Sequence, residues 1–143
     1  MGKKFLIVLL LILAAAGFGI LKLVNAYKKA GQLGDAAVEH YHSQFNARAD
    51  AEIYQNAGRP FKMATTEAQF GAEWNRLHGG LGAFKSGTRQ GLSMNNDNGD
   101  KRITLTYAST YEKGVADEVF IFDYNGDLPV LIGVNVKSPV FNQ

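Results

Sequence analysis

The histidines of this sequence are the first side chains to consider for chemistry. His40 and His42 lie two residues apart in a segment with helical periodicity. On a helix, positions i and i+2 are rotated by about 200° and cannot bind one metal ion together. We therefore expect His42 to flank a buried apolar stripe beside Tyr41, and His40 to be solvated. The sequence predicts no metal site and no bound cofactor.

His78 follows Trp74 by four residues, near the predicted end of another helix. An imidazolium at that position would interact favourably with the negative end of the helix dipole. This structural role is favoured over acid–base catalysis.

Two short motifs that suggest ligand binding fail on their details. Residues 82–89 have the spacing of a phosphate-binding P-loop, but Thr88 stands where the loop needs lysine, and the segment runs from a helix into a strand. Residues 95–100 look like part of a calcium loop. Aligned on Gly99, its first and twelfth positions would be Met94 and Leu105, which offer no carboxylate. We interpret these residues as a hairpin turn.

The elements that must position these side chains begin with helices. Apolar residues recur every three or four positions over residues 33–45, which predicts an amphipathic helix. A short helix is expected over residues 51–57, ending at the Gly58-Arg59-Pro60 segment. A capping box at Thr66 and Gln69 then starts a third helix, for which Gly79 and Gly80 mark the exit. Its buried stripe is Phe70, Trp74, Leu77 and Leu81.

Four strands are expected after the helices. The predicted segments are residues 84–94, with bends at Gly87 and Gly91, followed by residues 103–111, 115–124 and 130–136. Val119 and Ile121 alternate with Phe120 and Phe122, which suggests a central strand covered on both faces. Asn125-Gly126 is a hairpin signal. Helices followed by an antiparallel meander predict an α+β fold, with the helices on one face of a four-stranded sheet.

The first 26 residues form a signal or membrane-anchor segment, and residues 27–143 form the folded domain. Lys3 and Lys4 precede seventeen uncharged, mainly apolar residues, 5–21. Extended to residue 24, with Lys22 reaching the interface, this run could cross a bilayer as a helix. Small residues at 14–16 and 24–26 also allow cleavage by signal peptidase. An uncleaved anchor with its C-terminal domain outside is favoured, and a cleaved signal is the alternative.

Charge and cysteine content exclude several classes of function. The chain has a formal charge of +2 and no cysteine. Disulfides, thiolate metal sites, a cysteine nucleophile and a lipid-modified cysteine are therefore excluded. From residue 27 onward the net charge is −1, because three of the basic residues belong to the membrane segment and its flanks. This balance gives no reason to expect nucleic-acid binding.

Two segments carry a resemblance to a known family. ATTEAQFGAEWNRLHGGLGAFKSGTRQG and ITLTYASTYEKGVADEVFIF resemble small bacterial envelope proteins of unknown function. Their domain is cystatin-like and related to the cone-shaped fold of nuclear transport factor 2, and the likeness covers residues 35–138. It implies an α+β cone in the bacterial envelope. Many members carry a lipoprotein cysteine that this chain lacks, and the Q-x-V-x-G loop of cystatin inhibitors is also missing. The resemblance supplies no catalytic residues.

The leading interpretation is a non-enzymatic binding or interaction module. It would be tethered to the inner membrane through residues 5–24 with its domain in the periplasm, and an envelope protein is a candidate partner. The residues expected to bind a ligand or partner are Trp74, His78, Tyr107 and Phe120.

The alternative is a small-molecule-binding or isomerase-like enzyme of the cone fold. A carboxylate inside the cone would act as the base, with a tyrosine or histidine as hydrogen-bond donor. The candidate groups are Asp117, Glu118, Asp123, Tyr107, Tyr111 and His78. Asp117 and Asp123 lie near strand ends, where carboxylates are usually solvated, so this alternative rests on fold analogy.

Overall fold

The structure is a computed structural model that describes the backbone of residues 2–125 and 128–142, and the side chains of residues 16–17, 19–125 and 128–142. It confirms an α+β fold with a four-stranded antiparallel sheet. The elements in chain order are α1 (Gly2–Asn46), α2 (Asp50–Asn56), α3 (Arg59–Ala64), α4 (Glu67–Leu81), β1 (Phe84–Asp97), β2 (Asp100–Tyr111), β3 (Val115–Asp123), β4 (Val130–Lys137) and a 3₁₀ turn (Pro139–Asn142).

The chain divides into two compact units, the first ending at Gln32 and the second beginning at Leu33. The second unit contains the sheet, α2 to α4 and the end of α1. Most of the expected membrane segment, residues 5–21, lies outside the residues whose side chains are described. Within the described part of the chain, no helix is both long enough and apolar enough to cross a membrane.

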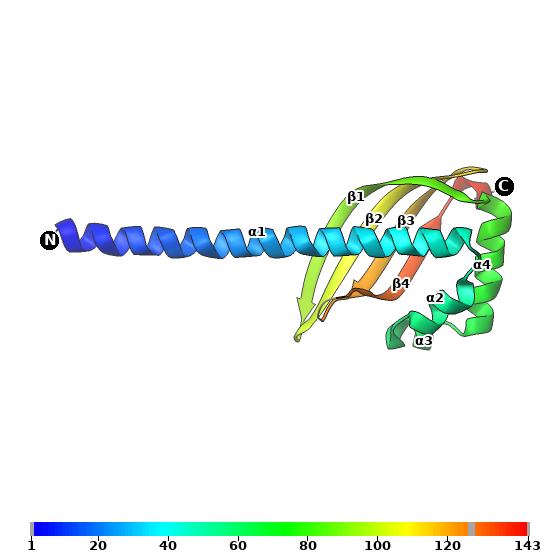
Figure 1. Ribbon diagram of the computed structural model, residues 1–143, viewed down its shortest axis with the longest axis horizontal. Helices are drawn as coiled ribbons and strands as arrows, with labels where there is room; N and C mark the ends of the chain where they lie inside the picture. The colour runs from blue at the N-terminus through cyan, green and yellow to red at the C-terminus, as the bar shows by residue number, and fades with distance from the viewer. Residues whose placement is uncertain (1, 126–127, 143) are drawn as a thin grey trace. The chain divides into compact units, whose positions relative to one another are not determined.

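The sheet has the order β1-β2-β3-β4, so that β1 and β4 are its edges (Figure 1). Alternate residues of β2 and β3 point inward, where Ile103, Leu105, Phe120 and Phe122 are buried. Burying a side chain of this size stabilises the fold by roughly 1.5–3 kcal/mol. The inward side of the two central strands therefore forms the sheet side of the hydrophobic core.

The end of α1 packs closely on the inward side of these strands. A Cβ built on Gly34 would lie 2.5 Å from Cδ1 of Leu105, so glycine allows the helix to approach the sheet there. Val38, Tyr41 and Phe45 follow on the same face and are buried. As predicted, His42 is buried beside Tyr41, while His40 is exposed.

Helix α4 begins as the sequence predicts. The side chain of Thr66 accepts a hydrogen bond from the backbone N–H of Gln69, and the side chain of Gln69 accepts one from the N–H of Thr66. These two bonds satisfy backbone donors that the first helical turn leaves free. The expected stripe of Phe70, Trp74, Leu77 and Leu81 is buried.

The short helix α2 ends before the Gly58-Arg59-Pro60 segment, as predicted. The same segment also begins α3, which the sequence analysis does not predict; proline fits the first turn of a helix, where its missing N–H costs nothing. One prediction about the helices is wrong. Gly79 and Gly80 do not end α4, which continues to Leu81. The helix ends at Gly82, whose φ of 71° suits glycine.

The strands also differ from the prediction in places. β1 continues through Asp97, and the turn to β2 narrows to Asn98 and Gly99, both at positive φ. Register shifts fall between Phe84 and Ser86 and between Arg89 and Gly91, so only the second of the two expected glycine bends lies at one.

Strand β3 is central, as expected, but it is not covered on both faces. Val119 and Ile121, on the side away from the helices, are only half-buried. In the Asn125-Gly126 hairpin signal, Gly126 lies outside the described residues.

Candidate functional site

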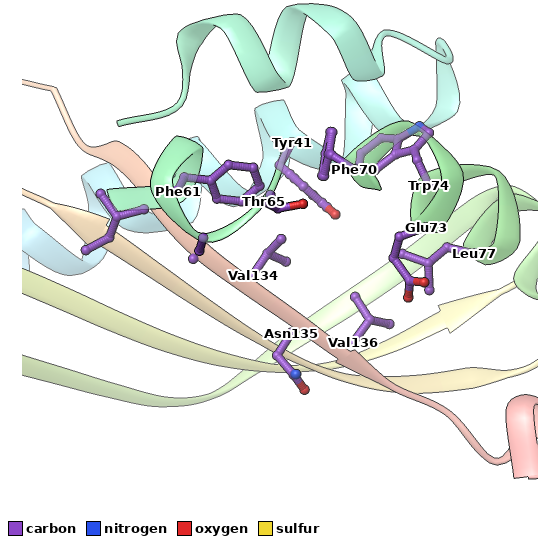
Figure 2. A pocket seen from close by; sticks show the side chains of 13 residues that line it. Tyr41, Phe61, Thr65, Phe70, Glu73, Trp74, Leu77, Val134, Asn135 and Val136 are labelled. Carbon is purple, nitrogen blue, oxygen red and sulfur yellow. The ribbon is translucent and has the colours of Figure 1, made fainter. Parts of the chain in front are cut away.

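The candidate site is a cavity of about 310 Å³ between α3, α4 and the edge strand β4 (Figure 2). Its size is at the lower end of the range typical of small-ligand pockets. Most of its wall is apolar and comes from four aromatic rings and several aliphatic chains. The principal wall residues are Tyr41, Phe61, Phe70, Trp74, Leu77 and Val134.

Local structure explains why these rings meet. The capping box fixes where α4 starts, which places Phe70, Trp74 and Leu77 on one helix face. Trp74 packs edge-on against Tyr41 of α1, with ring centroids 5.3 Å apart, and Phe70 contacts both Trp74 and Phe61. The backbone N–H of Gly58 donates to the carbonyl of Leu131 at 2.8 Å, which holds the start of α3 against β4.

The hydroxyl of Tyr41 lines the cavity and differs from the other buried tyrosine hydroxyls. The hydroxyls of Tyr54, Tyr107 and Tyr111 each donate to an oxygen of the protein. In the described part of the chain, the Tyr41 hydroxyl makes no hydrogen bond, although Tyr41 is only 4% exposed. Its pKa is well above the ordinary value, first because of burial and second because of the charge of Glu118. Tyr41 is therefore a neutral hydrogen-bonding group that faces the cavity.

The rim of the cavity carries a charged pair. Glu73 accepts two hydrogen bonds from Arg76, and this interaction lowers the pKa of the Glu73 carboxyl. Both side chains are about half exposed, so the pair contributes little to stability. Glu73 is consequently an ionised group at the entrance, already paired with a cation.

A second polar cluster lies between α1 and the inward side of the sheet, and it does not line the cavity. Glu118 is 1% exposed and accepts hydrogen bonds from Ser109 and Tyr111. Nε2 of His42 lies 2.8 Å from Oε2 of the same carboxylate. Burial, then the negative charge of Glu118, raises the pKa of Tyr111 far above the ordinary value.

The register of β2 on β3 assembles this cluster. Glu118 is paired with Tyr107 and is diagonal to Ser109, so the strands bring these side chains to one face. His42 reaches Glu118 from α1 and stacks on Phe84, with ring centroids 3.6 Å apart. Both carboxylate oxygens are engaged, and we interpret the cluster as the polar anchor that holds α1 on the sheet.

Asp35 joins α1 to the sheet at a second point. It accepts hydrogen bonds from the Tyr107 hydroxyl and from Nη1 of Arg89, the latter at 3.1 Å. Burial, followed by the hydrogen bond to Asp35, raises the pKa of Tyr107. In the described part of the chain, no group of three or more His, Asp or Glu residues is placed to hold a metal ion.

The four residues expected to bind a ligand fall in different places. Trp74 lines the cavity, whereas His78 does not and instead stacks on Phe45, with ring centroids 3.9 Å apart. Tyr107 belongs to the Asp35 contact, and Phe120 lies buried beneath Tyr41. Only Trp74 of the four therefore forms part of the cavity wall.

The expected dipole role of His78 is wrong. Burial, and then the nearby charge of Arg48, lowers the pKa of His78, so the side chain is neutral at pH 7. The Nε2 atom of His78 and the Nε1 atom of Trp74 are buried without a partner among the described residues.

Sequence reasoning missed Tyr41 as a site residue and did not select Glu118 over its neighbours. The signal for Glu118 was present, because alternation puts it on the same side of β3 as Phe120 and Phe122. For Tyr41, the helical stripe indicated burial and gave no sign that its hydroxyl would face a cavity. Of the aspartates, Asp117 is exposed and Asp123 pairs with Arg102 at 3.4 Å.

Comparisons of the chain with protein-family models, with curated proteins and with solved structures find no match.

Proposed function

We propose that this protein is a membrane-tethered component of the bacterial envelope, whose periplasmic domain is a non-enzymatic binding module. The observation that carries the binding function is the cavity of about 310 Å³ beside Trp74, walled by four aromatic rings. Open apolar cavities with few polar groups are the usual form of small-ligand sites.

The tether and the location rest on the sequence. The basic pair at Lys3 and Lys4, followed by the apolar run, supports an anchor, with secretion after signal cleavage as the alternative. The resemblance of residues 35–138 supports a cystatin-like cone in the envelope. A four-stranded sheet with helices packed against it is compatible with that cone.

A non-enzymatic role is favoured by the position of the carboxylates. The carboxylate inside the fold is Glu118, and it is fully engaged by His42, Ser109 and Tyr111 away from the cavity. A general base must reach the proton that it removes. The carboxylate at the cavity is Glu73, which lies at the rim and is already paired with Arg76.

The binding function is tested by filling the cavity. Ala64 lines the cavity and is exposed, so Ala64→Phe would occupy its space without entering the core. Ala72→Phe, on the exposed side of α4, is the matched control. Trp74 is the only tryptophan, so its emission reports directly on ligands in the cavity.

We expect small aromatic compounds to change Trp74 emission saturably in the wild type and in Ala72→Phe, with the response lost in Ala64→Phe. A response that is the same in all three proteins would place binding elsewhere and contradict the proposal. Separately, Ala substitution of Asp117, Asp123 and His78 in a folded protein should leave ligand binding unchanged.

A further inference from the structure

We propose that the ligand of the cavity is a compact, largely apolar molecule with one hydrogen-bond acceptor oxygen, which is bound by the hydroxyl of Tyr41. This inference rests on the proposed binding function and specifies the chemistry of the molecule that the cavity takes. It follows from the shape of the wall and from the Tyr41 hydroxyl, which makes no hydrogen bond within the described part of the chain.

The first step concerns the hydroxyl itself. A hydroxyl that faces an open cavity can exchange water for a ligand oxygen, and a ligand that excludes water without offering an acceptor would leave the hydroxyl unpaired at a cost of roughly 1–3 kcal/mol. Tyr41 is 4% exposed, and in the described part of the chain its hydroxyl bonds to nothing. Figure 2 shows its oxygen directed into the space between Phe70, Glu73 and Val134. A ligand oxygen placed there would satisfy it.

The second step concerns the ligand atom that meets the hydroxyl: whether it donates or accepts a hydrogen bond, and whether it carries a charge. The raised pKa of Tyr41 keeps its proton on the hydroxyl at neutral pH, so the group can donate to a ligand acceptor. The negative charge of the buried Glu118, which acts on the Tyr41 hydroxyl, makes an anionic ligand unfavourable beside it. A neutral carbonyl or ether oxygen therefore fits better than a carboxylate or a phosphate.

The third step concerns the body of the ligand. Aromatic rings attract other rings in edge-on or offset arrangements, and Phe61, Phe70 and Trp74 offer three such surfaces. Val134 and Leu77 complete an apolar wall. A flat hydrocarbon skeleton of one or two rings matches this lining and the volume of about 310 Å³.

The experiment compares 1-indanone with indane, which has the same skeleton without the oxygen. Both are titrated into the full chain in lipid vesicles that contain no other protein, with Trp74 emission as the readout. The affinity of each probe is compared between the wild type and the variants at the same lipid concentration. Partition of the probe into the bilayer is then the same in every sample and does not affect the comparison. The variants are Tyr41→Phe, which removes only the hydroxyl, and Tyr124→Phe, which removes a hydroxyl outside the cavity. Thermal unfolding verifies that each variant is folded.

We expect Tyr41→Phe to weaken 1-indanone binding about 5- to 10-fold, as the loss of one hydrogen bond implies, and to leave indane binding unchanged. Tyr124→Phe should change neither affinity. If Tyr41→Phe binds 1-indanone as tightly as the wild type does, the acceptor-oxygen inference is overturned while the cavity remains a binding site. If neither probe binds the wild type, the inference and the proposed binding function both fail.

Should Tyr41→Phe prove unfolded, Ala64→Phe provides the second route. Competition between 1-indanone and indane for the wild type then decides the question. A preference of 5-fold or more for the ketone that Ala64→Phe abolishes supports the inference, and equal affinity for the two probes contradicts it.

Discussion

At the scale of single residues, the distinctive feature of this molecule is a carboxylate in its core. Glu118 would be costly to bury alone, because transfer of an unpaired charge from water to the interior is strongly unfavourable. Here it accepts hydrogen bonds from two hydroxyls and contacts the His42 ring. The cost of burial is therefore offset only while all the partners are present, so the cluster should be sensitive to small changes.

We predict that Glu118→Gln lowers the free energy of unfolding by about 2–4 kcal/mol. Glutamine keeps the size of the side chain but has a single acceptor oxygen to meet donors from three residues. Urea unfolding followed by circular dichroism measures the change. Asp117→Asn, the same chemical change one residue earlier on an exposed side chain, should stay within about 0.5 kcal/mol of the wild type. If the two substitutions changed the free energy of unfolding equally, the hydrogen bonds of the Glu118 cluster would make no particular contribution to stability, and the prediction would be wrong.

His78 predicts a pH dependence of stability. Burial lowers its pKa in the folded protein below the unfolded value of about 6.5. As the pH falls, the unfolded chain therefore binds a proton at His78 before the folded protein does. The contribution of neutral His78 to stability is complete above the unfolded pKa and is lost as the pH falls toward the folded pKa. In His78→Phe, the loss of unfolding free energy between pH 7.5 and 5.5 should be smaller than in the wild type. His40→Gln, on an exposed histidine, should retain the wild-type profile, and a His78→Phe profile that matches it would contradict the prediction.

At the scale of elements, the contact between α1 and the sheet depends on one glycine. Gly34 is buried, and the space that its Cβ would occupy is taken by the side chain of Leu105, which is 0% exposed. Interiors are packed as tightly as crystals, so neighbouring atoms cannot move away freely. The closeness of α1 to β2 is thus set by the absence of a side chain.

We predict that Gly34→Leu destabilises the fold by about 1–3 kcal/mol through overpacking. Gly79→Ala, in α4, is the control, because a Cβ at that position meets nothing within 4 Å. Alanine in place of a helical glycine should raise stability there by about 0.5–1 kcal/mol. Thermal unfolding measures both, and a neutral Gly34→Leu would show that the helix can shift away from the sheet.

The sequence predicts elements well where a local signal defines them. The Thr66 capping box marks the start of α4, and the alternation of Ile103 and Leu105 gives the buried side of β2. The extra helix α3 was missed because Pro60 ends one helix and begins the next. Gly34 was not singled out, and the cavity was not foreseen, because both depend on contacts between segments distant in the chain.

At the scale of the whole molecule, the net charge of the first 26 residues differs from that of the rest of the chain. The chain carries +2, but residues 27–143 carry −1, so the basic excess belongs to the N-terminal segment. A nearly neutral domain gains little from electrostatic attraction to anionic partners. This balance agrees with the proposal that a ligand is recognised by the apolar cavity and not by surface charge.

The proposed anchor can be tested by membrane extraction. We expect the intact 15.6 kDa chain to stay in the membrane pellet after an alkaline carbonate wash. Leu10→Lys places a charge in the apolar run, at a cost of about 2.5–3.5 kcal/mol near the centre of a spanning helix, and should release much of the protein. Leu128→Lys, the same change on a side chain that is 76% exposed in the domain, should not. Mass spectrometry of the wild type distinguishes the alternative, because a soluble product that lacks residues 1–26 would show that the segment is a cleaved signal and that the domain acts free in the periplasm.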